Sequence, residues 1–118
     1  MKIKTIAAVM IHIPNWEEGL EWYKKAFPEA KIIEYPEFNF RCLNINGINI
    51  ECVQADEKVG AGAFGLAVDW EVECFDEAFN HLTSLGATLY RGPMEIDRGW
   101  RMCKLNDPYG NLIGSRGP

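Results

Sequence analysis

The feature that most constrains this chain is an internal repeat with a period of about sixty residues. Residues 13–20 and 72–79 both read as the end of a strand followed by the first turns of a helix. Residues 41–45 and 101–105 match in the same way, and Arg41 aligns with Arg101. A repeat of this length predicts two copies of one supersecondary unit within the 118 residues.

The first half contains the signals for one strand, one helix and three further strands. Pro14 ends the first apolar segment, and Asn15 with Glu18 forms the start of a capping box. Pro28 ends the helix, and Asn46-Gly47 is typical of a two-residue hairpin turn. The strands of this half are predicted at 4–13, 30–35, 38–46 and 48–54, with the helix between the first two.

The second half repeats this plan after a glycine-containing linker. Asp107-Pro108-Tyr109-Gly110 is a strong turn signal, because proline fixes its own φ and glycine accepts a positive φ. We expect a single domain spanning 1–118, with module one at about 4–54 and module two at about 64–116. The second module's elements are predicted as strands at 64–73, 87–91, 99–106 and 111–116, and a helix at about 75–85 ended by Gly86.

Composition restricts the classes of partner. The formal net charge of −5 argues against nucleic acid and anionic membranes as partners. No signal peptide or membrane-spanning run is apparent, so a cytoplasmic location is expected. The four cysteines fall in strand-like segments without metal or redox spacing, which favours buried, reduced thiols.

Tandem βαβββ modules of which the second ends in Asp-Pro-Tyr-Gly-Asn-Leu-Ile resemble the vicinal oxygen chelate superfamily. That superfamily contains glyoxalase I, extradiol dioxygenases, and fosfomycin- and bleomycin-resistance proteins. The resemblance implies an α+β fold in which curved mixed sheets surround a cleft, with the helices on the convex side, commonly in a homodimer. Such a fold supports both enzymes and binding proteins.

The resemblance also implies positions for a divalent metal, which this chain does not fill. The positions that provide ligands in metal-dependent relatives correspond to Ala8, Glu51, Ala67 and Gly114. Methyl groups and a glycine hydrogen cannot donate lone pairs, so we expect no metal and no other cofactor. A relocated site made by His12, Glu51, Asp69 and Glu71 is the alternative, and metal analysis of the purified protein tests it.

Strand alternation predicts which side chains line the cleft. Leu66 and Val68 are expected to pack under the helices, whereas Cys42 and Asn49 face the cleft. Two other interpretations remain open: the aromatic residues fill the cleft as core, or the acids are solvated rim charges. Arg41 and Arg101 are expected on the helix side or in solvent, where they can pair with acidic neighbours. The predicted ligand-binding residues are Met10, His12, Phe40, Glu51, Asp69, Glu71, Trp100 and Met102.

Three functions follow from these residues. The leading hypothesis is a metal-independent, dimeric protein, nearest the bleomycin-resistance branch, that sequesters a hydrophobic or cationic aromatic small molecule. The second is a glyoxalase- or dioxygenase-like lyase, isomerase or oxygenase with a displaced metal, or with metal-free acid–base catalysis by Glu51 or Glu71. The third is a structural or regulatory partner protein whose cleft is filled by its own side chains.

Overall fold

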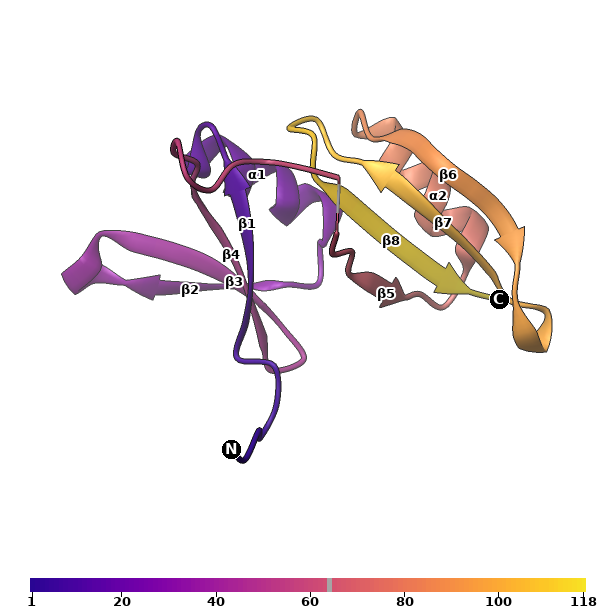
Figure 1. Ribbon diagram of the computed structural model, residues 1–118, viewed down its shortest axis with the longest axis horizontal. Coiled ribbons are helices and arrows are strands. Elements are labelled where there is room, and N and C mark those ends of the chain that lie inside the picture. Colours follow the sequence, from indigo (N-terminus) through magenta and orange to yellow (C-terminus); the bar gives the residue numbers. More distant parts are fainter. Residues whose placement is uncertain (64) are drawn as a thin grey trace. The chain divides into compact units, whose positions relative to one another are not determined.

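The computed structural model describes residues 1–63 and 65–118, which form two compact βαβββ units (Figure 1). Unit 1 comprises Met1–Gly60 and unit 2 comprises Ala61–Pro118. In the described residues, each unit has one four-stranded mixed sheet and one α-helix. The α+β architecture of tandem βαβββ modules predicted from the repeat is therefore confirmed. Phe64, the first residue of a predicted strand, lies outside the described residues.

The sheet of unit 1 has the strand order β1-β4-β3-β2. Strand β1 runs parallel to β4, and the other neighbours are antiparallel. A short 3-10 helix lies in the turn between β2 and β3. The elements are β1 (Ala8–Ile13), α1 (Trp16–Ala26), β2 (Lys31–Tyr35), η1 (Pro36–Phe38), β3 (Phe40–Ile45) and β4 (Ile48–Gln54).

Helix α1 begins and packs as its sequence predicts. The Asn15 side chain accepts a hydrogen bond from the Glu18 backbone N–H at 3.3 Å, which satisfies one of the free donors of the first turn. Leu20 and Tyr23 are buried beneath the helix. A Cβ at Gly19 would lie 2.3 Å from Ile13 Cδ1, so the glycine permits close contact between helix and sheet.

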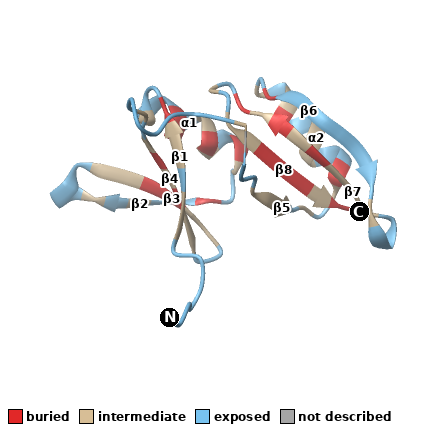
Figure 2. Cartoon of the chain, viewed as in Figure 1, coloured by how far each residue is buried: buried red, intermediate tan, exposed pale blue. Residues whose placement is uncertain are grey.

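The sheet of unit 2 has the equivalent order β5-β8-β7-β6, with β5 parallel to β8. Its core contains Phe75 and Leu82 from the helix and Leu105 and Ile113 from the sheet (Figure 2). The elements are β5 (Asp69–Glu71), α2 (Phe75–Ser84), β6 (Thr88–Glu95), η2 (Asp97–Gly99), β7 (Arg101–Asn106) and β8 (Leu112–Gly117).

The turn before β8 is organised by Asp107. This side chain is only 4% exposed, and its Oδ1 accepts hydrogen bonds from the backbone N–H groups of Tyr109 at 2.8 Å and Asn111 at 2.9 Å. Gly110 adopts a φ of 92°, in the left-handed region that favours glycine. The buried carboxylate thus accepts hydrogen bonds from two backbone N–H groups of the predicted turn that would otherwise need backbone carbonyl partners.

Several predicted strand boundaries were wrong. The first strand begins at Ala8 rather than residue 4, because its partner β4 begins at Ile48 and Ala8 already pairs with Asn49. Strand β5 has three residues instead of ten, and Leu66, which was expected to pack, is 85% exposed.

Strand β6 is longer than predicted and reaches Glu95, because β7 extends to Arg101 and pairs with it. Pro93 is tolerated within it because β6 is an edge strand with register shifts on either side of Arg91. All four cysteines are free thiols; Cys42, Cys52 and Cys103 are buried, and Cys74 is half-buried. Within the described residues, no helix has the length and apolar character needed to span a membrane.

Candidate functional site

One face of the unit 1 sheet carries the four site residues predicted for the first half. Helix α1 packs on the face that contains Leu43 and Ile50, both fully buried. The parallel register aligns Met10 with Glu51 and His12 with Val53, and the antiparallel register aligns Tyr35 with Phe40. We call this side the open face of unit 1; its main residues are Met10, His12, Tyr35, Phe40, Glu51 and Val53.

The open face of unit 1 contains a shallow groove of about 530 Å³. Phe40 and Glu51 were predicted as ligand-binding residues, whereas Tyr35 and Phe38 were not. Tyr35 is the strand partner of Phe40, and Phe38 lies in η1 with 77% of its surface exposed. Phe38 lies two residues before Phe40 along the chain, a spacing that could have identified it, whereas no local signal marks Tyr35. The groove is lined by Tyr35, Phe38, Phe40, Glu51 and Val53.

A chain of hydrogen bonds positions the Tyr35 ring. The Asn44 Nδ2 group donates to Asn49 Oδ1 at 2.8 Å, and Asn49 Nδ2 donates to the Tyr35 hydroxyl oxygen at 3.4 Å. These contacts hold the phenol ring at one wall of the groove. Cys42 lies next to it, where burial and then the negative charge of Glu51 raise the pKa of the thiol, partly offset by a hydrogen bond with Tyr35. Cys42 is therefore a neutral thiol and a poor nucleophile.

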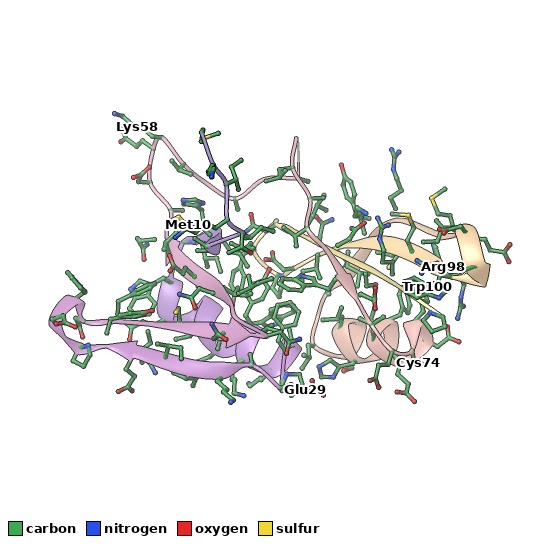
Figure 3. The ribbon with its side chains drawn as sticks, turned by 90° about the horizontal axis from the view of Figure 1, so that it is seen from below. Met10, Glu29, Lys58, Cys74, Arg98 and Trp100 are labelled. Carbon is green, nitrogen blue, oxygen red and sulfur yellow. The ribbon has the colours of Figure 1, made fainter. Side chains whose placement is uncertain are left out.

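The Glu51 carboxylate is available to a ligand. No described residue donates a hydrogen bond to it or forms an ion pair with it. Its neighbour in the register, Met10, is 54% exposed and offers only apolar contacts (Figure 3). A half-buried carboxylate among aromatic rings favours an organic cation with a flat apolar body.

The equivalent face of unit 2 carries a closed ion-pair cluster formed by Asp69, Lys104 and Arg116. Asp69 Oδ1 accepts a hydrogen bond from Lys104 Nζ at 2.6 Å, and Oδ2 accepts one from Arg116 Nε at 3.2 Å and another from its Nη2. Burial raises the pKa of the Asp69 carboxyl, but the hydrogen bonds and charges of the two cations outweigh it and leave this pKa below its usual value. Both oxygens of this predicted cleft acid are therefore engaged within the protein.

The remaining predicted residues of unit 2 lie near this cluster or at the β6–β7 turn. Glu71 is exposed. In the strand register it lies opposite Arg116 of β8, and Arg116 lies opposite Met102 of β7. Trp100 is half-buried, and the Arg98 guanidinium carbon lies 4.0 Å from its ring centroid (Figure 3). The Trp100 ring thus already has a cation on one face.

The residues present do not fit the divalent metal of the superfamily's enzymes. A Cβ at Gly114 would lie 1.8 Å from Asp69 Oδ1, so the Asp69 carboxylate occupies the space that a ligand side chain would need. Ala67 is exposed and Ala8 offers only a methyl group. In the described parts of the chain, no three His, Cys, Asp or Glu side chains gather as a metal centre would require, and this includes the relocated set.

The helix-side arginines pair with acids, as the sequence suggested. Arg101 Nη1 lies 2.9 Å from Asp76 Oδ1, and Arg41 Nη2 lies 3.9 Å from Glu17 Oε2. Each acid lies in the first turn of its helix, so the repeat places the two pairs at corresponding positions. Arg41 therefore lies on the opposite side of its sheet from the open face of unit 1, and Arg101 lies opposite the equivalent face of unit 2.

Comparison with known proteins supports the fold. No protein-family model matches the chain, and no curated protein matches its sequence. Among solved structures, FosX, a fosfomycin resistance protein from Listeria monocytogenes, is similar with a TM-score of 0.77 and 13% identity over 99% of this chain and 95% of that one.

Two further structures are similar. A glyoxalase/bleomycin resistance protein/dioxygenase family enzyme from Burkholderia phytofirmans has a TM-score of 0.75 and 19% identity over 94% of this chain and 96% of that one. An integron cassette protein from the mobile metagenome of V. cholerae has a TM-score of 0.73 and 18% identity over 99% and 97%. At these identities the similarity concerns the fold, and the predicted vicinal oxygen chelate resemblance is confirmed at that level.

Proposed function

We propose that this protein binds an organic cation with a flat aromatic body in the groove of unit 1, without a metal ion, and sequesters it. The observation that carries the proposal is the Glu51 carboxylate, which has no ion-pair or hydrogen-bond partner among the described residues yet lies in a groove with three aromatic side chains. In this proposal the protein acts as a homodimer and is nearest in function to the bleomycin-resistance branch of the fold.

The physical basis is the combination of stacking with charge compensation. Tyr35 and Phe40 offer ring faces and edges, and each aromatic pair contributes about 0.5–1.5 kcal/mol beyond the area it buries. A cation bound beside Glu51 loses part of its hydration shell but gains the attraction of the carboxylate. This attraction is stronger in the groove than in bulk water, because the effective dielectric constant is lower there. Because the groove is open, the bound ligand keeps part of its surface in water.

Isothermal titration calorimetry with N-methylquinolinium tests the proposal. We expect saturable binding, no binding of the anionic, similarly shaped 1-naphthoate, and about tenfold weaker binding to Glu51→Gln. Glu21→Gln is the matched control, since Glu21 is an exposed residue of α1 and its loss should leave the affinity unchanged. Equal affinity of Glu51→Gln and the unaltered chain contradicts the proposal.

A further inference from the structure

A second pocket of unit 1 lies beside the first turn of α1, apart from the open groove. It has a volume of about 190 Å³ and is bounded by strands β2 and β3 as well as by the helix. We call it the helix-side pocket. Among its lining residues are Trp16, Glu17, Glu34, Pro36, Phe40 and Arg41.

Of the three charged side chains that line the pocket, Glu34 and Arg41 have opposite charges but do not pair with each other. Glu34 and Arg41 are direct partners in the β2–β3 register, so their side chains project on the same side of the sheet. No described residue forms a hydrogen bond or an ion pair with the Glu34 carboxylate. Among the described residues, the ion pair of Arg41 is with Glu17, at 3.9 Å between Nη2 and Oε2, which is too long for a hydrogen bond.

In unit 2 the corresponding arginine, Arg101, has close partners for its guanidinium group. Arg101 contacts Asp76 at 2.9 Å, and its guanidinium carbon lies 4.7 Å from the Phe75 ring centroid. In unit 1 the ring at the equivalent helix position, Trp16, packs instead against Phe40, with centroids 5.2 Å apart. The Arg41 guanidinium therefore keeps donors that its counterpart uses internally.

We propose that the helix-side pocket binds a free α-amino acid with an apolar side chain. The ligand carboxylate accepts hydrogen bonds from Arg41, the ammonium group donates to Glu34, and the side chain packs against Trp16 and Pro36. The volume of the pocket equals that of about six water molecules in the liquid. This is smaller than the pockets that bind drug-sized ligands and is suitable for one amino acid. The site is independent of the Glu51 groove, although Phe40 lines both.

An NMR titration of the ¹⁵N-labelled chain with L-leucine tests this site. We expect saturable shifts of the amides near Trp16, Glu34 and Arg41, with a dissociation constant of about 1 mM for so small a ligand. Leucinamide, which lacks the carboxylate, and 4-methylpentanoate, which lacks the ammonium group, should each bind at least about tenfold more weakly.

Two variants test which protein side chain binds each charged group of the ligand. Arg41→Met should remove the preference for leucine over leucinamide, and Glu34→Gln should remove the preference over 4-methylpentanoate. Arg101→Met is the matched control, because it removes the corresponding arginine of unit 2 and should leave leucine binding unchanged. The proposal is overturned if leucine gives no saturable shift in this region, if the three compounds bind equally, or if both variants retain the preferences.

Discussion

The two units share one framework but arrange their carboxylates differently. In unit 1 the register places Glu51 of β4 beside Met10 of β1, and the carboxylate is the β4 residue. In unit 2 it places Gly114 of β8 beside Asp69 of β5, and the carboxylate is on the neighbouring strand. The missing side chain at Gly114 makes room for Asp69, since a Cβ there would overlap its Oδ1 atom.

The surroundings of the two carboxylates differ as well. Unit 2 supplies Lys104 and Arg116, which engage both Asp69 oxygens. In unit 1 the repeat places Asn44 at the position of Lys104, and its amide is used to hold Asn49. Val53, two residues beyond Glu51 on the same face, brings no charge. The two units therefore differ by a few side chains: Asp69 stabilises its own unit, whereas Glu51 remains available to a ligand.

The largest expected effect comes from removing the paired carboxylate. Asp69→Asn leaves Lys104 and Arg116 facing each other without a counter-charge, so we expect a loss of about 2 kcal/mol in the free energy of unfolding. Glu51→Gln in unit 1 should change it by less than about 0.5 kcal/mol. Urea denaturation of both variants measures the contrast, and equal losses would remove the distinction between the units.

Gly114→Ala tests the close contact behind the cluster. The new methyl group displaces the Asp69 carboxylate, and we expect a cost of about 1.5 kcal/mol. The cost should fall in part when the same substitution is made in an Asp69→Ala background, because the closer clash is gone and the 2.9 Å approach to the Val68 backbone oxygen remains. Gly62→Ala is the control, since a Cβ at that position would have no atom within 4 Å and the stability should not change. A cost that is the same in both backgrounds contradicts this account.

Val53→Arg makes unit 1 resemble unit 2. The introduced guanidinium lies on the same strand and face as Glu51, so it should pair with this carboxylate and fill part of the groove. We expect the affinity for N-methylquinolinium to fall at least about tenfold, whereas Val53→Met, similar in length but neutral, should have a smaller effect. Calorimetry compares them; equal effects would mean that volume rather than charge decides binding.

The smallest effect is the pH dependence that the Asp69 cluster of unit 2 contributes. The pKa of Asp69 is lower in the folded protein than in the unfolded chain, where aspartate titrates at about 3.9. The resulting stabilisation is present above about pH 4 and is lost as the pH falls through the lower folded-state pKa. The stability difference between the unaltered chain and Asp69→Asn should therefore shrink from pH 5 towards pH 3, as urea denaturation at each pH will show; a constant difference would exclude an electrostatic origin.

The sequence was sufficient for the framework because repeat period, capping and turn signals are local. The Asn15 cap and the Asp107 turn are examples, each formed by residues within a few positions of one another. The strand limit at Ala8 depends on where its distant partner β4 begins, which no local pattern records.

The chemistry of the sites depends even more on non-local contacts. Strand alternation placed Asp69 on the open side of its sheet but could not show that Lys104, 35 residues away, reaches it. Tyr35 was missed for the same reason: its role becomes visible only from its pairing with Phe40 and its hydrogen bond from Asn49.

The most direct test of the difference between the units is to map where a cationic aromatic probe binds. N-methylquinolinium is titrated into the ¹⁵N-labelled chain, and the amide shifts are followed in both units. We predict saturable shifts at Tyr35, Phe40, Glu51 and Val53, with Asp69, Lys104 and Arg116 unchanged. In Glu51→Gln the same shifts should saturate at about tenfold higher probe concentration. Shifts centred on the Asp69 cluster, or an unchanged dissociation constant in Glu51→Gln, would contradict the account.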